Sequence, residues 1–309
     1  MSRLQRILIF FSVVVILLIQ TMTTQAFAAS ISIAGMNAFD FFKSGVEKTQ
    51  SGDLKQAVGD FTQAIALDSQ MAGAYSNRCL VYIQLGDYSK ATEDCTEALK
   101  LNPNNTETYL NRGLAYYRQG RYLDAITDYN QVIQLDPTDY RAYYNRGLAR
   151  FEQKDYSEAI ADYNQALSHT PTQHSQAMAT VYNDRGLTYF QLEDIENAML
   201  DFSQAIHLDS NDARAYYNRG CISHRQGDYT GAIRDFTASL QRNPNQAQAY
   251  INRGIARYQL GYLQTALEDL RKGAECFCTQ RQMVAYQQTL NLIKKIQQQS
   301  SSDEEGAIG

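Results

Sequence analysis

A short pattern, Tyr-x-Asn-Arg followed by a small residue, returns through the sequence with a period of 34 residues, and this period constrains the fold more than any other feature. The degenerate first copy spans Phe41–Gly45, and the later copies span Tyr75–Cys79, Tyr109–Gly113, Tyr143–Gly147, Tyr182–Gly186, Tyr216–Gly220 and Tyr250–Gly254. The spacing is 34 throughout except between the fourth and fifth copies, where it is 39. A fixed period of this length indicates an array of stacked supersecondary units.

Seven repeats follow from this period, and further positions recur within them. The repeats are 38–71, 72–105, 106–139, 140–173, 179–212, 213–246 and 247–280. Position 20 is always alanine, and position 8 is glycine in all but the second repeat. Position 24 is large and apolar except for Cys95, and all four prolines of the chain stand at position 32. Small residues at positions 8 and 20 allow two helices of one repeat to approach closely, and proline ends the second helix.

These positions resemble the signature of the tetratricopeptide-repeat (TPR) family over residues 38–280, and the repeat style is similar to that of bacterial, including cyanobacterial, members. The resemblance implies an all-α fold, a right-handed superhelical α-solenoid of seven helical hairpins whose first helices line an inner groove. The sequence departs from the signature locally, since Ser69 and Ser210 replace proline and Lys154 and Glu193 replace the glycine of the inter-helix turn.

The end of such an array needs a polar cap, because a single hairpin cannot bury its own apolar face. Apolar residues recur at helical spacing over 281–299, at Met283, Tyr286, Leu290, Ile293 and Ile296. This spacing predicts an amphipathic capping helix. The acidic tail, 300–309, is expected to be disordered.

The first residues differ from the rest of the chain and have the three parts of an export signal. Arg3 and Arg6 precede an apolar run, Ile7–Ile19, and small residues follow at Ala26–Ser30. This order predicts a signal peptide over 1–28, cleaved after Ala28 or else Ala29, and a linker over 29–37. An apolar helix of that length rises roughly 20 Å, short of a hydrocarbon core of roughly 30 Å. The alternative is an uncleaved membrane anchor formed by residues 7–19.

Charge and motifs exclude several classes of function. The net charge is −5 and no basic block is present, which argues against a nucleic-acid-binding protein. The sequence contains no glycine-rich phosphate loop, zinc-binding helix motif or nucleophile elbow. We therefore expect neither an enzyme nor a cofactor or metal, and catalytic residues are not assigned.

Two charged positions recur in a way that predicts a structural ladder of ion pairs, comprising Asp60, Arg78, Asp94, Arg112, Asp128, Arg146, Asp162, Arg185, Asp201, Arg219, Asp235 and Arg253. Position 23 is aspartate in every repeat, and position 7 is arginine in all but the first, which has Ser44. The missing arginine favours pairing of each arginine with the aspartate of the preceding repeat. Arg112 is then expected nearer to Asp94 than to Asp128, with pairing inside one repeat as the alternative.

The resemblance places position 6 on the inner face, where asparagine amides bind the backbone of an extended peptide. The predicted peptide-binding residues are Asn77, Asn111, Asn145, Asn218 and Asn252, with the aromatic residues Tyr117, Tyr144, Phe151, Phe190, Tyr217 and Tyr258. The alternative is that these asparagines bond within their own repeat. The family's carboxylate clamp for chaperone tails is not supported, because only Lys43 and Arg141 or Arg214 approach its pattern.

Repeat five contains two local exceptions. The insertion 174–178 has good helix formers and no glycine or proline, so it predicts a first helix extended at its N-terminus by about one turn, with an outer loop as the alternative. Asp184 replaces the asparagine of position 6. We expect the inner surface to change its chemistry at this repeat.

The cysteines leave one question open. Cys79 and Cys95 occupy positions 8 and 24 of the second repeat, so they form either a disulfide or a pair of small core residues.

The leading hypothesis for the function of the protein is an exported scaffold, in periplasm, thylakoid lumen or outside the cell, that binds protein or peptide partners. The alternative is a membrane-tethered TPR assembly factor for a larger membrane or photosynthetic complex.

Overall fold

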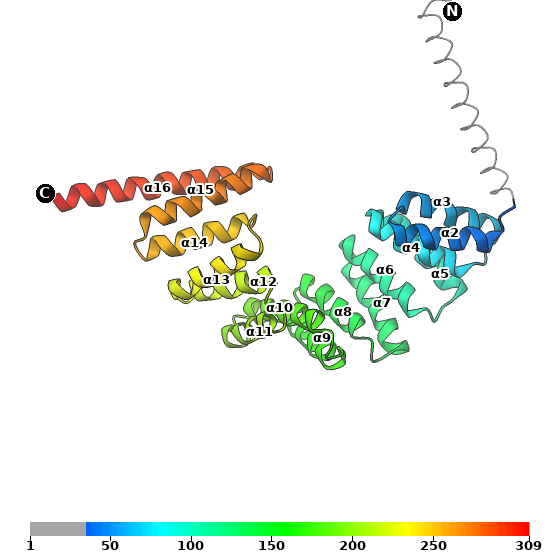
Figure 1. Ribbon diagram of the computed structural model, residues 1–309. Helices are drawn as coiled ribbons and strands as arrows, with labels where there is room; N and C mark the ends of the chain where they lie inside the picture. Colours follow the sequence, from blue (N-terminus) through cyan, green and yellow to red (C-terminus); the bar gives the residue numbers. More distant parts are fainter. Residues whose placement is uncertain (1–34, 309) are drawn as a thin grey trace, which may run out of the picture. The chain divides into compact units, whose positions relative to one another are not determined.

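The computed structural model describes residues 35–308, and side chains up to residue 299. Over this range the chain forms fifteen helices and no strand, which confirms the all-α class (Figure 1). The helices are α2 (Ala38–Ser51), α3 (Leu54–Leu67), α4 (Ala72–Leu85), α5 (Tyr88–Leu101), α6 (Thr106–Arg118), α7 (Tyr122–Leu135), α8 (Tyr140–Glu152), α9 (Tyr156–His169), α10 (Ser175–Gln191), α11 (Ile195–Leu208), α12 (Ala213–Arg225), α13 (Tyr229–Arg242), α14 (Ala247–Gln259), α15 (Leu263–Thr279) and α16 (Met283–Ile308).

From α2 to α15 the helices form seven successive hairpins, one for each repeat. They belong to two compact units, which divide between Gln131 and Val132 inside α7. Within the first unit α3 packs against both α2 and α4, and α5 against both α4 and α6. Within the second unit each helix from α9 to α15 packs against its neighbours in the chain, and α16 packs against α15. Packing of neighbours in sequence is what a repeat architecture requires.

Each hairpin turns at a residue in the left-handed backbone conformation, which ends the first helix. Glycine occupies this position in five repeats, and Lys154 and Glu193 adopt the same conformation with φ values of 66° and 60°. Their substitution for glycine therefore leaves the turn unchanged. An aspartate caps three of the second helices, α5, α11 and α13, as Asp194 does by accepting a hydrogen bond from the backbone N–H of Asn197.

The residues at positions 8 and 24 are complementary in volume. A Cβ atom added at Gly147 would lie 2.7 Å from Cε1 of Tyr163, a fully buried ring. In the second repeat position 8 carries a side chain and position 24 is small, and Cys79 and Cys95 form a disulfide with their Cα atoms 5.5 Å apart. This settles the open question about these cysteines: a covalent bond here replaces the packing of a ring on glycine.

The charged ladder is present, but its predicted pairing is wrong. Arg112 donates to Asp128 of its own repeat, from Nε at 2.8 Å and from Nη2 at 2.7 Å. The same bonds join Arg78 to Asp94, Arg146 to Asp162, Arg185 to Asp201, Arg219 to Asp235 and Arg253 to Asp269. Positions 7 and 23 face each other across one hairpin, which is the physical reason. In the first repeat Asp60 binds Ser44 and Lys48 instead, each at 2.6 Å.

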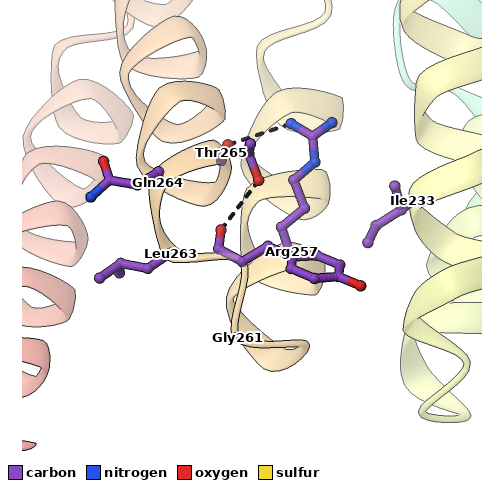
Figure 2. Close-up of a pocket in the computed structure, with 7 residues that line it drawn as sticks. Ile233, Arg257, Gly261, Leu263, Gln264 and Thr265 are labelled. Carbon is purple, nitrogen blue, oxygen red and sulfur yellow. Dashed lines mark hydrogen bonds between the residues drawn. The ribbon is translucent and has the colours of Figure 1, made fainter.

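The arginine at position 7 also contacts the preceding repeat. Its third guanidinium nitrogen, Nη1, donates a hydrogen bond to the side chain at position 25 of that repeat. Nη1 of Arg78 donates to Thr62, and Nη1 of Arg253 donates to Thr237 at 3.0 Å. Equivalent bonds join Arg112 to Thr96, Arg185 to Asn164 and Arg219 to Ser203. Some ladder aspartates bind a second arginine, as Asp269 binds Arg257 at 2.7 Å. The Arg257 guanidinium also donates a hydrogen bond to the backbone carbonyl of Thr265 (Figure 2).

The predicted extension of the first helix of repeat five is confirmed. α10 begins at Ser175 and has 17 residues, whereas the first helices α8, α12 and α14 have 13. The inserted residues from Ser175 onward are therefore helical. Buried Ala179 and Val181 show that the lengthened helix is held in the packed interior from its second turn.

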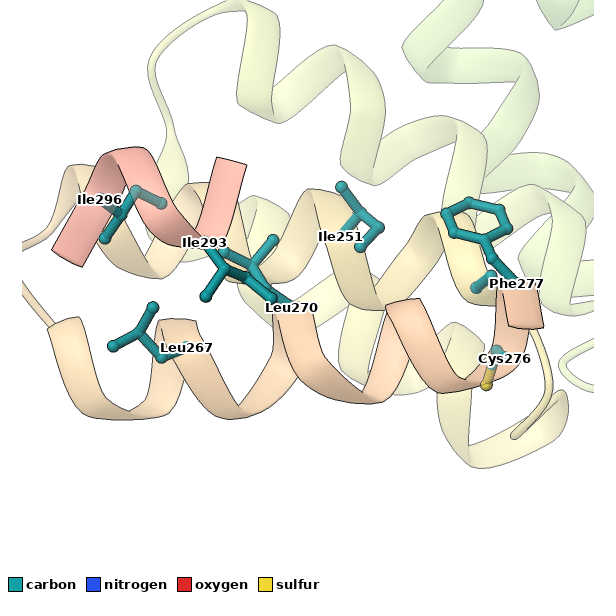
Figure 3. Packing of buried hydrophobic residues seen from close by; sticks show 8 residues of the cluster. Ile251, Leu267, Leu270, Cys276, Phe277, Ile293 and Ile296 are labelled. Carbon is teal, nitrogen blue, oxygen red and sulfur yellow. The ribbon is translucent and has the colours of Figure 1, made fainter. Parts of the chain in front are cut away.

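The capping helix α16 covers the apolar face that α15 would otherwise expose. Ile293 and Ile296 pack with Leu267, Leu270 and Ile251 in one buried cluster (Figure 3). The expected end of this helix at residue 299 is wrong, because α16 continues to Ile308 through the segment that was expected to be disordered. The physical reason is that no proline interrupts the segment and that a helix already formed adds residues at little cost.

The predicted signal peptide, its cleavage site and most of the linker lie outside the described residues. Among residues 35–308 none of the helices has the length and apolar character needed to cross a membrane.

Candidate protein-binding surface

All eleven residues of the predicted peptide-binding surface lie on the first helices of their repeats, and all are partly buried. They come from α4 and α6 in the first unit, namely Asn77, Asn111 and Tyr117. The others come from α8, α10, α12 and α14 in the second unit, namely Tyr144, Asn145, Phe151, Phe190, Tyr217, Asn218, Asn252 and Tyr258. Partial burial means that each side chain is held by neighbours while some of its surface faces solvent.

In the second unit a regular set of hydrogen bonds joins position 5 of one repeat to position 6 of the next. The Tyr144 hydroxyl donates to Asp184 at 2.8 Å. Two repeats further along, the Asn252 amide donates to the Tyr217 hydroxyl at 3.2 Å. Between them the Asn218 amide donates to Asn183 Oδ1 at 3.0 Å. We call these six side chains the polar row.

Two asparagines of the second unit, Asn218 in the polar row and Asn145 next to Tyr144, keep part of their hydrogen-bonding capacity. The Asn218 amide donates within the row, and no described residue donates to its carbonyl oxygen. The Asn145 side chain, within α8, makes no hydrogen bond with any described residue. In the first unit the Asn77 amide donates to the backbone carbonyl of Gly73 at 2.8 Å, which is the bond within its own repeat that the sequence analysis gave as the alternative. Asn145 and Asn218 therefore retain groups that can bond a partner backbone, whereas the Asn252 side chain accepts from Gln248 and donates to Tyr217 and Cys221.

The aromatic residues of this surface are held against the core and the turns. Tyr144 and Tyr217 pack against the buried rings of Tyr163 and Phe236, with ring centroids 6.2 and 5.8 Å apart. Phe151 packs against Tyr156 at the inter-helix turn, at 5.5 Å. Rings fixed in this way contribute contact area with little loss of conformational entropy on binding.

Two residues of this surface, Asn183 and His224, were not among the sequence candidates. Asn183 occupies position 5 and is buried at the centre of the polar row, a role visible only once the contact between repeats is known. His224 shares position 12 with Tyr117 and Phe151, a register that could have identified it. Its Nε2 atom is buried without a partner among the described residues, and burial lowers the pKa of the imidazole, which favours the neutral form.

The basic residues near the polar row are already paired. Arg214 donates to Asp212 from Nε and Nη2, at 3.1 and 2.8 Å, and Arg141 makes the same pair of bonds with Asp139. The Nε–Nη2 edge of each guanidinium is therefore occupied by a carboxylate of its own chain.

A separate hollow lies at the turn between α14 and α15 (Figure 2). It has a volume of about 610 Å³ and is lined by Ile233, Arg257, Gly261, Tyr262, Leu263, Gln264 and Thr265. None of the predicted peptide-binding residues lines it. Among the described residues no group of three or more histidines, cysteines or acids is arranged to hold a metal ion.

Several solved structures share this fold. A tetratricopeptide repeat protein from Parabacteroides merdae has a TM-score of 0.65 and 18% sequence identity, with 82% of this chain and 98% of that chain covered. Pseudomonas aeruginosa pilF has a TM-score of 0.58 and 18% identity, covering 71% and 96%. The APC/C hetero-tetramer Cut9–Hcn1 has a TM-score of 0.61 and 20% identity, covering 71% of this chain and 42% of that chain. The chain thus spans less than half of that last protein, and such low identities show the fold alone.

Family models match the repeats directly, whereas no curated protein matches the sequence. Models described as tetratricopeptide repeat match residues 110–174 and 213–246, and one described as TPR repeat matches 80–120 and 186–227. Together these matches cover about half of the chain, within the region where the seven hairpins lie. The chain belongs to the tetratricopeptide-repeat family.

Proposed function

We propose that this protein is an interaction scaffold that binds a segment of a partner protein along the first helices of its second unit. The observation that carries the proposal is that Asn218 of the polar row and Asn145, which follows Tyr144 of the row, keep unused hydrogen-bonding groups beside rings fixed by the core. An extended peptide offers backbone donors and acceptors that match such amides. A partner of this kind needs no cofactor.

Peptide selection with matched variants tests this proposal. The purified full chain is used to select binders from a displayed library of random twelve-residue peptides. We expect the double variant Asn145→Ala/Asn218→Ala to bind the selected peptides about tenfold more weakly, because each lost hydrogen bond costs about 0.5–1.5 kcal/mol. The matched control is Gln165→Ala/Gln204→Ala, which removes two exposed amides from the second helices α9 and α11. Equal loss in both variants, or no binders at all, would contradict the proposal.

We also propose that the protein is exported, in agreement with the signal predicted at its N-terminus. The disulfide between Cys79 and Cys95 supports this, because disulfides persist in oxidising compartments and are rare in the cytosol. When the full sequence is expressed in a bacterial host, we expect the intact mass of the product to correspond to a chain that begins at Ala29. A mass that includes residues 1–28 would favour the membrane-tethered alternative instead.

A further inference from the structure

We propose that Asp184 binds a cationic side chain, a lysine or an arginine, of the partner segment that lies along the polar row. This inference rests on the proposed function and names the chemistry of one partner residue. Asp184 stands at position 6 of repeat five, where five other repeats have asparagine. The polar row thus has one carboxylate, at one defined place.

Asp184 differs from the ladder aspartates and from the N-cap residues Asp139 and Asp212 in having no cation. The ladder aspartates each bind an arginine or a lysine, and Asp139 and Asp212 each bind an arginine. No lysine, arginine or histidine of the described chain forms an ion pair with Asp184. Its Oδ2 atom accepts from the Tyr144 hydroxyl at 2.8 Å, and its Oδ1 atom accepts from the Asn183 amide at 3.1 Å. A carboxylate has about four acceptor positions, so about two remain for a partner.

The carboxylate is held in a fixed position before any partner arrives. Tyr144 reaches it from α8, Asn183 comes from the same helix α10, and Asn183 is itself bound by Asn218 from α12. Three helices therefore determine its orientation. A fixed acceptor raises affinity because less conformational entropy is lost on binding.

Its electrostatic surroundings favour a cation. The charged or titratable groups that act on Asp184 are Tyr144 on α8, Arg214 on α12 and Asp212, the residue that caps α12. Arg214 and Asp212 are paired, so their charges largely cancel at this distance. Burial raises the pKa of the Asp184 carboxyl, and the hydrogen bonds from Tyr144 and Asn183 oppose that rise only in part. An ammonium or guanidinium group would supply the missing counter-charge.

The experiment uses the same displayed twelve-residue library with the wild-type chain, Asp184→Asn and a control. Asp184→Asn is close in shape and restores the residue found in other repeats. Glu196→Gln is the control, since it removes one negative charge from an exposed position on the second helix α11. We expect peptides selected by the wild type and by the control to have lysine or arginine at one fixed position, and peptides selected by Asp184→Asn to lack it.

One selected peptide then gives a quantitative test. Replacing its basic residue by methionine is expected to weaken binding to the wild type at least tenfold and to leave binding to Asp184→Asn unchanged. Because Asp184 binds the cation only when ionised, wild-type affinity should fall as the pH is lowered through its raised pKa, and the affinity of Asp184→Asn should not. Peptides that bind without a fixed basic residue, or that bind Asp184→Asn equally well, would overturn the inference and leave the scaffold intact. Absence of any binding peptide would contradict the proposed function itself.

Discussion

Replacing Asp235 by alanine is expected to lower the free energy of unfolding of the second unit by about 3 kcal/mol. The Asp235 side chain is only 2% exposed and accepts two hydrogen bonds from Arg219, at 2.8 and 2.9 Å. Its removal leaves a partly buried guanidinium without a counter-ion, a change that costs about 3–5 kcal/mol in buried pairs. We expect the lower end because the Arg219 side chain is 20% exposed and water can reach it. Urea unfolding followed by circular dichroism measures the change.

The double variant Asp235→Ala/Arg219→Met separates loss of the pair from burial of an unpaired charge. It should be less destabilised than Asp235→Ala alone, because no unpaired charge remains. Glu275→Ala is the matched control, since its ion pair with Lys272 is exposed and should leave the unfolding midpoint unchanged. A double variant that is less stable than Asp235→Ala would show that the cost comes from lost packing instead.

Loss of the disulfide is the second change for which we expect a large effect. The bond closes a loop between residues 16 apart in sequence, and for a loop of that size the stabilisation is about 3 kcal/mol. Cys79→Ala/Cys95→Ala should therefore lower the stability of the first unit, and hydrogen exchange in α4 and α5 should become faster. Reduction of the wild type should reproduce both effects.

Counting thiols provides the check on this prediction. Under denaturing conditions without reductant, three thiols should react, those of Cys221, Cys276 and Cys278, and five should react after reduction. The control Cys278→Ser changes an exposed cysteine and should not alter stability. Five reactive thiols in the unreduced protein isolated from an oxidising compartment would contradict the assignment.

The period of the sequence predicted the hairpins, and the composition of the insertion 174–178 predicted the extended α10, whereas contacts between repeats were harder to predict. Arg112 lies 18 residues after Asp94 and 16 before Asp128, so both pairings fit the period equally well. Only the geometry of the hairpin distinguishes them. The lack of an arginine in repeat one was misleading, because Lys48 lies one turn beyond Ser44 and supplies the cation.

For the candidate surface, too, the sequence indicated the positions of the residues but not the hydrogen bonds between repeats. Position 6 recurs, so its asparagines and Asp184 could be identified from the sequence. Their bonds depend on which residue of the preceding repeat reaches them, and that residue differs, being tyrosine at Tyr144 and Tyr217 but asparagine at Asn183. Likewise, composition suggested a disordered tail, whereas α16 continues to Ile308 because helix propagation from the cap outweighs the local polar composition.

The ion pairs inside each hairpin have a consequence for how a chain of this type changes its length over generations. Since the arginine and the aspartate belong to one repeat, as Arg219 and Asp235 do, a duplicated or deleted hairpin carries both charges with it. In the remaining bond Nη1 donates to the residue at position 25 of the preceding repeat. That acceptor can be threonine, serine or asparagine, as Thr62, Ser203 and Asn164 show. A hairpin can therefore join a new neighbour without creating a buried unpaired charge, and gain or loss of whole repeats is electrostatically neutral.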